Sequence, residues 1–177
     1  LVTTSITSPT GTVKWCLSET QTTRPANGSA TCTGGVGTDN GWYTSLPSTF
    51  TLTSGNTLKT VYIWVTDNAN NTNANVSTGT ITVDQNPPAT PTISMTDPNT
   101  GSTTQTNQFL VDLSITADTD AVRWCPIIQA AAAAAPSTPA SNDSCWRSTR
   151  PVTQLIDATG SRTVYVFTSD LAGNIGS

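Results

Sequence analysis

The chain has 177 residues, of which only 10% are charged, and its formal net charge is −4. It contains no His and a single Glu, so it lacks the imidazole base of most hydrolase sites, and we expect no enzyme. The mildly acidic balance argues against a nucleic-acid partner, and no segment has the roughly 20 apolar residues of a membrane span. Thr occurs 37 times and, with abundant Ser, Asn and Gly, favours an all-β fold.

The first half of the chain carries alternating patterns that predict β-strands. Residues 1–8, LVTTSITS, form the first, and VKWC follows. Because successive side chains of a strand point to opposite faces, Val13 and Trp15 are expected in the core, with Cys16 on the outer face. The segment VYIWV alternates in the same way, with aromatic residues outward. Its expected core residues are Val61, Ile63 and Val65.

A proline-rich segment divides the chain. It contains three prolines between residues 87 and 91, which stiffen the connection and oppose strand pairing across it. The strand-like segments TGTITVD and PTISM lie on either side. We therefore predict a linker at residues 85–90, between a first domain of residues 1–84 and a second domain of residues 91–177.

The second domain repeats the elements of the first. VRWC repeats VKWC 109 residues later, and TVYVFTSDLAGN matches TVYIWVTDNANN at a separation of 103 residues. FLVDLSI, at residues 109–115, predicts a further strand. Because the two separations, 109 and 103 residues, are not equal, they indicate one module repeated with loops of different length. The expected core residues of the second domain are Val122, Trp124, Val164 and Val166.

The two domains differ in the strands that the chain includes. Residues 91–108 precede FLVDLSI and have no counterpart before Leu1, whereas the counterpart of ANVSTGTITVD would lie beyond Ser177. We expect the first domain to lack a first strand and the second to lack a last strand. Either the chain is a window of a longer repeat array, or strands from neighbouring chains complete each domain.

Four cysteines occur as two equivalent pairs, although four cysteines allow three pairings. The repetition favours Cys16–Cys32 and Cys125–Cys145, and each bridge would hold a loop over the outer aromatics and contribute about 3 kcal/mol. Zinc, the alternative, would favour closer ligands and a His. The loop of the second domain contains six Ala, Ala130 to Ala135, too few for an independent helix. Disulfides imply an oxidising location: the cell exterior, the cell surface or the periplasm.

The last strand-like segment of each repeat carries a further motif. VYIWVTDNANN and VYVFTSDLAGN resemble the V-x-V-x-D-x-A-G-N pattern of bacterial immunoglobulin-like (Ig-like) repeats, and the linker from Asp84 to Pro91 is also similar to theirs. This resemblance covers nearly the whole chain. It implies two tandem Ig-like antiparallel β-sandwich domains from a large surface or secreted adhesin or fibre. The Trp-Cys strand with its disulfide loop is not a general feature of that family.

Asp67 and Asp170 begin the D-x-A-x-N turns of the two repeats. A carboxylate at this position is expected to cap the backbone N–H groups of a tight turn. The alternative is a calcium site that also includes Asp84 at the domain junction, because calcium stiffens the linkers of some extracellular repeats. Calcium requires six to eight oxygen ligands, and the local supply is small. No other metal or cofactor is expected.

Trp42 and Trp146 lie near the ends of the two disulfide loops, next to Tyr43 and Arg147. We expect both tryptophans to pack beneath the loops. The alternative is an aromatic platform for a sugar ring, formed by each Trp with its neighbour.

These observations favour a structural and adhesive module of a bacterial extracellular or cell-surface fibre, with the disulfide loops as its contact surface. Its partners would be neighbouring Ig-like repeats or identical subunits, and a cell-surface glycan or protein. One alternative is a filament subunit whose domains are completed by strands from neighbouring chains. Another is a carbohydrate-binding or spacer module of a secreted enzyme.

Overall fold

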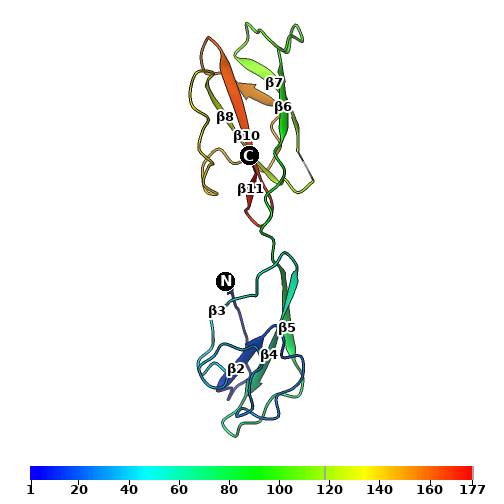
Figure 1. The fold of residues 1–177 in the computed structure, drawn as a ribbon, viewed down its shortest axis with the longest axis vertical. Helices are drawn as coiled ribbons and strands as arrows, with labels where there is room; N and C mark the ends of the chain where they lie inside the picture. Colours follow the sequence, from blue (N-terminus) through cyan, green and yellow to red (C-terminus); the bar gives the residue numbers. More distant parts are fainter. Residues whose placement is uncertain (118, 177) are drawn as a thin grey trace. The chain divides into compact units, whose positions relative to one another are not determined.

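The computed structural model describes residues 1–117 and 119–176, which form β-strands and turns without a helix (Figure 1). The chain divides into two compact units, Leu1–Asp84 and Gln85–Ser177, so residues 85–90 belong to the second unit. All strand pairs in the described residues are antiparallel. The prediction of an all-β fold is therefore confirmed. The described part of the chain contains no helix with the length and apolar character needed to span a membrane.

The first unit contains two sheets. The smaller sheet pairs β1 (Val2–Thr3) with β3 (Thr49–Phe50). The larger sheet has the order β2-β4-β5, formed by β2 (Lys14–Ser18), β4 (Leu58–Thr66) and β5 (Ser77–Thr82). The central strand β4 contains the VYIWV segment. It pairs with β2 on one side and with β5 on the other.

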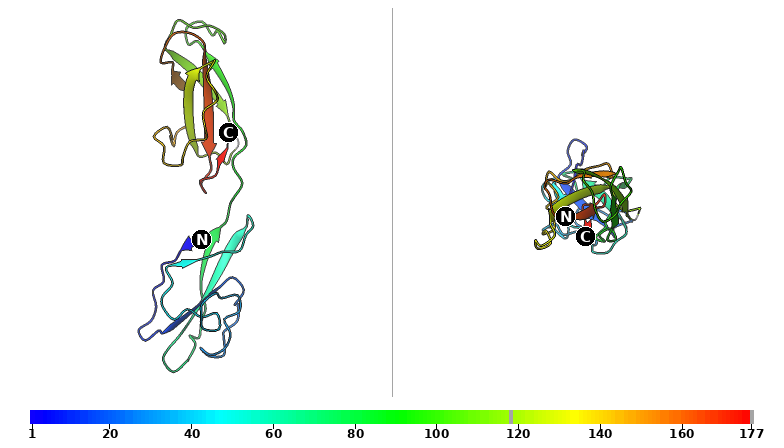
Figure 2. Two further views of the ribbon diagram at one scale, coloured as in Figure 1. Left: turned by 60° about the vertical axis from the view of Figure 1, so that its left-hand side comes forward. Right: turned by 90° about the horizontal axis from the view of Figure 1, so that it is seen from above.

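The second unit also contains two sheets, with the orders β6-β7-β9 and β8-β10-β11 (Figure 2). Their strands are β6 (Thr92–Thr96), β7 (Leu110–Thr116), β8 (Arg123–Ala130), β9 (Thr153–Leu155), β10 (Arg162–Ser169) and β11 (Ile175–Gly176). The long pair β8 and β10 corresponds to β2 and β4 of the first unit. In each pair, the strand that contains Trp-Cys is hydrogen-bonded to the strand that contains the Val-Tyr segment.

The two sheets of the second unit pack face to face. Leu113 and Ile115 of β7 form one buried cluster with Val164 and Val166 of β10. Buried and exposed residues alternate strictly along β7, which is the pattern expected of a strand with one face on a core. Partly buried residues of both sheets extend this cluster, namely Ile93, Met95, Trp124 and Ile128.

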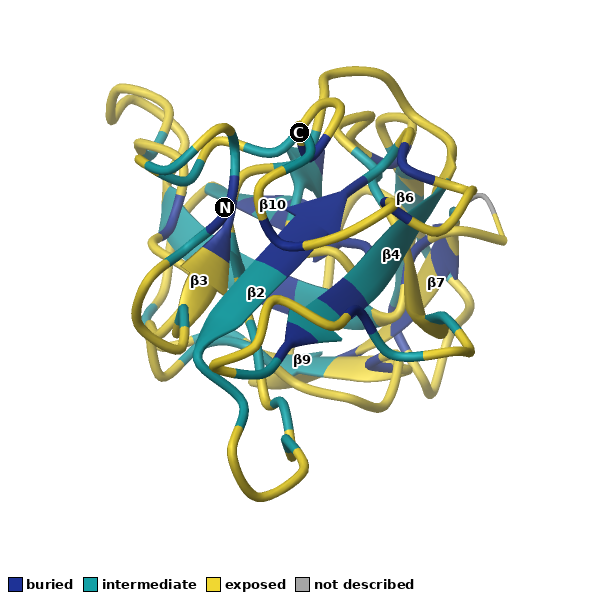
Figure 3. Ribbon diagram, turned by 90° about the horizontal axis from the view of Figure 1, so that it is seen from below, coloured by how far each residue is buried: buried dark blue, intermediate teal, exposed yellow. Residues whose placement is uncertain are grey.

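The buried cluster of the first unit lies on the outer face of its larger sheet. It consists of Cys16, Cys32, Trp42 and Trp64, with Val76 packed against it. Figure 3 shows buried stretches on β2 and β4. The predicted core residues of the first unit are only half-buried, although Leu17 of β2, which lies on the same face, is completely buried. These half-buried residues are Val13, Trp15, Val61, Ile63 and Val65.

One predicted core position is wrong. Val122 is 38% exposed, whereas Val164 and Val166 of the same unit are buried. Val122 lies immediately before the first residue of β8, and its backbone N–H donates to the Ser169 carbonyl oxygen at 2.8 Å. The Val122 backbone is therefore hydrogen-bonded. Its side chain lies at the end of the strand, where the opposite sheet does not cover it.

Candidate functional site

A disulfide fastens a long loop to the outer face of the first unit. Cys16 of β2 and Cys32 form the bridge, with their Cα atoms 5.7 Å apart. Beneath this loop the indole Nε1 of Trp64 donates to the Gln21 carbonyl oxygen at 2.8 Å. The indole of Trp42 donates to the Ala30 carbonyl oxygen at 2.7 Å. Both indole N–H groups thus find loop carbonyls, as buried tryptophans require.

Glycine allows the loop to turn so closely over this face. A Cβ atom at Gly37 would lie 2.0 Å from the carbonyl carbon and oxygen of Trp42, so no side chain fits there. Gly41 has a φ of 86°, in the left-handed region that favours glycine. The loop and Trp42 therefore pack at backbone distance.

Two basic side chains make polar contacts that hold the loop in place. The Lys14 ammonium lies 2.6 Å from the Asp39 carboxylate and donates to the Gly28 carbonyl oxygen at 3.2 Å. The Arg24 guanidinium donates to the carbonyl oxygen of Thr72. These polar contacts hold the loop in addition to the packing of the buried cluster.

The second unit has the corresponding disulfide, between Cys125 of β8 and Cys145, with their Cα atoms 4.9 Å apart. Its loop leaves more aromatic surface accessible, because Trp146 is only half-buried. The Trp146 indole donates to the Ala140 carbonyl oxygen at 2.7 Å, and the Arg123 guanidinium lies 5.2 Å from the centre of its ring. The Ala run from 130 to 135 is exposed.

The predicted sugar platforms differ between the units. Trp42 is completely buried, so the expectation that it packs beneath its loop is confirmed, and the alternative of a sugar platform is wrong there because the loop closes over the indole. Tyr43 is half-buried, and burial raises the pKa of its phenol. In the second unit Trp146 is half-buried, with Arg123 over its ring, and Arg147 is exposed. A contact surface at Trp146 and Arg147 stays a prediction.

The two D-x-A-x-N turns use their aspartates as caps. The Asp67 carboxylate accepts from the backbone N–H groups of Ala69 and Asn71, both at 2.9 Å, and from the Asn71 side chain at 3.0 Å. The Asn71 side chain is the main reason that the pKa of Asp67 is lowered. Asp170 accepts in the same way from the backbone and side chain of Asn174, at 2.8 and 2.7 Å.

The aspartates of the calcium alternative are divided between the two units. Asp67 belongs to the first unit and Asp84 is its last residue, whereas Asp170 belongs to the second. A carboxylate oxygen of Asp120, which the sequence analysis did not single out, lies within 4.8 Å of one from Asp170. Calcium binding stays a prediction.

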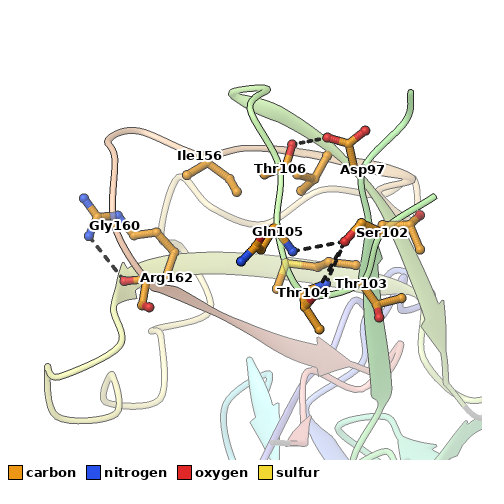
Figure 4. A pocket seen from close by; sticks show the side chains of 13 residues that line it. Asp97, Ser102, Thr103, Thr104, Gln105, Thr106, Ile156, Gly160 and Arg162 are labelled. Carbon is orange, nitrogen blue, oxygen red and sulfur yellow. Dashed lines mark hydrogen bonds between the residues drawn. The ribbon is translucent and has the colours of Figure 1, made fainter. Parts of the chain in front are cut away.

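The second unit also contains a polar pocket of about 630 Å³ that was not predicted from the sequence (Figure 4). The buried Asp97 stands at its rim and accepts hydrogen bonds from the backbone of Asn99 and Thr100, both at 2.8 Å, and from the Thr106 hydroxyl. The Thr106 hydroxyl is the main cause that lowers the pKa of Asp97 to about 2. Asp97 therefore orders the loop that follows β6. The Asp-Pro-Asn-Thr-Gly sequence is a turn signal that could have located it.

A second cavity lies in the first unit, between its two sheets. This groove of about 240 Å³ is lined by residues of β1 and the segment after it, of β2, β4 and β5, and by Phe50 of β3. Its aliphatic lining residues are Val2, Ile6, Leu17, Val61, Ile63 and Ile81. It faces the inner side of β4, opposite the disulfide loop.

In comparisons with known proteins, no family model, no curated protein and no solved structure matches the chain.

Proposed function

We propose that the chain is a structural and adhesive segment of a bacterial extracellular or cell-surface fibre, built from two Ig-like domains. The observation that carries this proposal is the repeated disulfide loop. In each unit a Trp-Cys strand next to the aromatic strand is bridged to a loop on the outer face, by Cys16–Cys32 and Cys125–Cys145. A repeated framework with loops of different sequence is the usual organisation of a scaffold that presents variable contact surfaces.

The chemistry of the units supports a mechanical role rather than catalysis. The disulfides require an oxidising compartment, outside the reducing cytoplasm. Asp67, Asp97 and Asp170 hold turns through hydrogen bonds, which is a structural use of a carboxylate. The low charged fraction of 10% leaves a neutral polar surface, suited to contact with glycans or with other modules.

The contact surface that we propose is the loop of the second unit. Trp146 offers a half-buried aromatic ring, and Arg147, the next residue in the sequence, offers an exposed guanidinium. This pair suits a sugar ring, which stacks on apolar ring surface and accepts hydrogen bonds from a cation. The first unit, whose Trp42 is closed off, would serve mainly as a spacer.

A glycan array probed with the oxidised 177-residue chain tests this role. We expect binding to a subset of glycans, and we expect a Trp146→Ala/Arg147→Ala double variant to lose it. Val152→Ala, which changes another exposed residue of the same unit, should retain it. Binding that survives the double variant would place the contact surface elsewhere. Absence of binding to glycans and to surface proteins would leave only the spacer role, with no adhesive one.

Electron microscopy of the native protein, purified without reductant, distinguishes a segment of a larger adhesin from a filament subunit. Separate particles would agree with a segment of a larger adhesin. Long regular filaments would instead favour the alternative in which neighbouring chains complete each other's sheets.

A further inference from the structure

The two disulfides differ in how far each is shielded from solvent. Cys16 and Cys32 of the first bridge are 0% and 2% exposed. In the second bridge Cys125 is likewise 0% exposed, but Cys145 is only half-buried. The second bridge therefore has one accessible member, whereas both members of the first bridge are covered.

Residues 33–41 account for the cover of the first bridge. They lie between Cys32 and Trp42 and turn back over the disulfide. The Cys32 N–H donates to the Asn40 carbonyl oxygen at 2.9 Å, and the Gly35 N–H donates to the Cys32 carbonyl oxygen at 3.0 Å. A Cβ atom at Gly35 would lie 2.4 Å from the Cys32 Sγ atom. The Gly35 backbone therefore packs directly on this sulfur and keeps other molecules away from it.

The second unit has no counterpart of this covering segment, because Cys145 and Trp146 are adjacent in the sequence. The loop before Cys145 adds little cover, since between residues 131 and 144 only Pro136 and Pro139 are not exposed. The accessibility of Cys145 therefore follows from the residues of the loop itself.

The two bridges also differ in the charge on their face of the sheet. Arg123 precedes Cys125 by two residues in β8, so both side chains point to the same face. The Arg123 guanidinium lies 5.2 Å from the centre of the Trp146 ring on that face. At the first bridge, the equivalent Lys14 is paired with the Asp39 carboxylate at 2.6 Å. A cation near a disulfide favours the thiolate that forms when the bridge opens.

We propose that Cys125–Cys145 is a modification site for thiols, at which a dithiol reductant opens the bridge in the folded protein while Cys16–Cys32 stays closed. Exposed disulfides are the ones that exchange readily, whereas a buried disulfide reacts only after the structure around it opens. The inference goes beyond the proposed function, because it concerns the chemistry of the bridge and needs no adhesive activity.

The exchange has two balanced steps. One thiol of the reagent loses its proton, and its sulfur attacks the Sγ atom of Cys145, because Cys125 is buried. A mixed disulfide forms, and the Cys125 sulfur leaves as a thiolate and takes up a proton. The second thiol of the reagent then loses its proton and displaces the Cys145 sulfur, which is protonated in turn. The reagent ends as an intramolecular disulfide, oxidised by two electrons, and the bridge is reduced by two.

Partial reduction of the oxidised 177-residue chain by dithiothreitol, without denaturant, tests the inference. Samples are quenched with acid at intervals, unfolded, alkylated with N-ethylmaleimide and digested with trypsin. Trypsin does not cleave before Pro25, so each bridge stays within one peptide, residues 15–59 or residues 124–147. We expect peptide 124–147 to be alkylated at least about tenfold faster than peptide 15–59. Equal rates, or faster alkylation of peptide 15–59, would overturn the inference.

A urea series shows whether the reagent attacks the folded protein. Attack on the accessible Cys145 needs no unfolding, so the rate for peptide 124–147 should change little at urea concentrations below the unfolding transition. Attack through an unfolded state would accelerate steeply, because the free energy of unfolding falls linearly with urea concentration. A steep rise in the rate would overturn the inference.

A pair of glycine variants tests why the first bridge is protected. Gly35→Ala places a Cβ atom against the Cys32 Sγ atom and displaces the covering segment, so peptide 15–59 should be reduced about tenfold faster or more. Gly79→Ala, in β5 of the same unit, meets nothing within 4 Å and should leave the rate unchanged. Equal rates in the two variants would overturn the role of residues 33–41 as the cover. The kinetics of the unmodified chain test the inference even if Gly35→Ala does not fold.

Discussion

Trp15 and Trp124 occupy equivalent positions in the two units and differ in one hydrogen bond. The indole Nε1 of Trp15 donates to the Ser8 hydroxyl at 2.6 Å. The corresponding nitrogen of Trp124 is buried and has no acceptor among the described residues. The residue of the second unit that aligns with Ser8 is Ala117. A buried donor without an acceptor costs about 1–3 kcal/mol, so this one difference affects the stability of the second unit.

We predict that Ala117→Ser stabilises the second unit by about 1 kcal/mol, because the new hydroxyl can accept from the Trp124 indole. Thermal unfolding of the oxidised chain measures the change. The matched variant is Ser8→Ala, which removes the existing bond and should destabilise the first unit by a similar amount. If Ser8→Ala destabilises the first unit but Ala117→Ser leaves the second unchanged, the Trp124 nitrogen has another partner.

The lowered pKa of Asp97 predicts a pH dependence for the second unit. A carboxyl group with a pKa of about 2 in the folded state and about 4 when unfolded binds its proton more tightly after unfolding. Its contribution is therefore fully present above about pH 4 and is lost as the pH falls through about 2. Urea unfolding at several pH values should show this decline. Asp97→Asn should reduce the slope, and an unchanged slope would assign the acid sensitivity to other groups.

At the scale of strands and loops, the outer face of each unit depends on its disulfide loop. The bridges close segments with sequence separations of 16 and 20 residues, for which chain entropy predicts similar stabilisation of about 3 kcal/mol. The first bridge is additionally part of the buried cluster with Trp42 and Trp64. The two loops thus differ in packing more than in length.

We predict that Cys16→Ser/Cys32→Ser destabilises its unit more than Cys125→Ser/Cys145→Ser destabilises the other. Opening the first loop also exposes Trp42, so the tryptophan fluorescence of that variant should shift to longer wavelength. Denaturant unfolding with fluorescence detection measures both effects. A melting temperature unchanged by complete reduction of the native chain would contradict the stabilising role of both bridges.

Backbone packing in the first loop leads to a sharper prediction at Gly37. Gly37→Ala places a Cβ atom 2.0 Å from the Trp42 carbonyl group, and this contact with backbone cannot be relieved by a side-chain rotation. We expect a loss of about 1–3 kcal/mol or more in the unfolding free energy. Gly79→Ala is the control, because a Cβ atom there meets nothing within 4 Å. Equal stabilities of the two variants would show that the loop shifts freely over the sheet.

At the scale of the whole molecule, two compact units with separate cores share one chain. Each has its own sheets and its own disulfide, so most of the stabilising contacts are internal to one unit. Chains of this kind usually depart from two-state unfolding.

We therefore predict two unfolding transitions in differential scanning calorimetry. Cys16→Ser/Cys32→Ser should move one of them, and Ala117→Ser should move the other. A single transition that both changes displace equally would show that the units unfold together.

The amino-acid sequence by itself determined the all-β class, the repeated strands and the assignment of residues to strand faces. These properties follow from local alternation and from the repeated spacing of Trp-Cys and Val-Tyr segments. Strand alternation assigns residues to a face but carries no information about what covers that face.

Only the tertiary structure decided which of those faces are buried. Val61 and Val164 have the same place in the same pattern, yet Val61 is half-buried and Val164 is 3% exposed. The reason is that β6 pairs with β7 in the second unit, whereas no strand among the described residues of the first unit pairs with the equivalent edge of β1. Trp42 is likewise closed off and Trp146 half-buried because the first loop packs more closely on its sheet. Burial depends on segments distant in sequence, which local patterns do not encode.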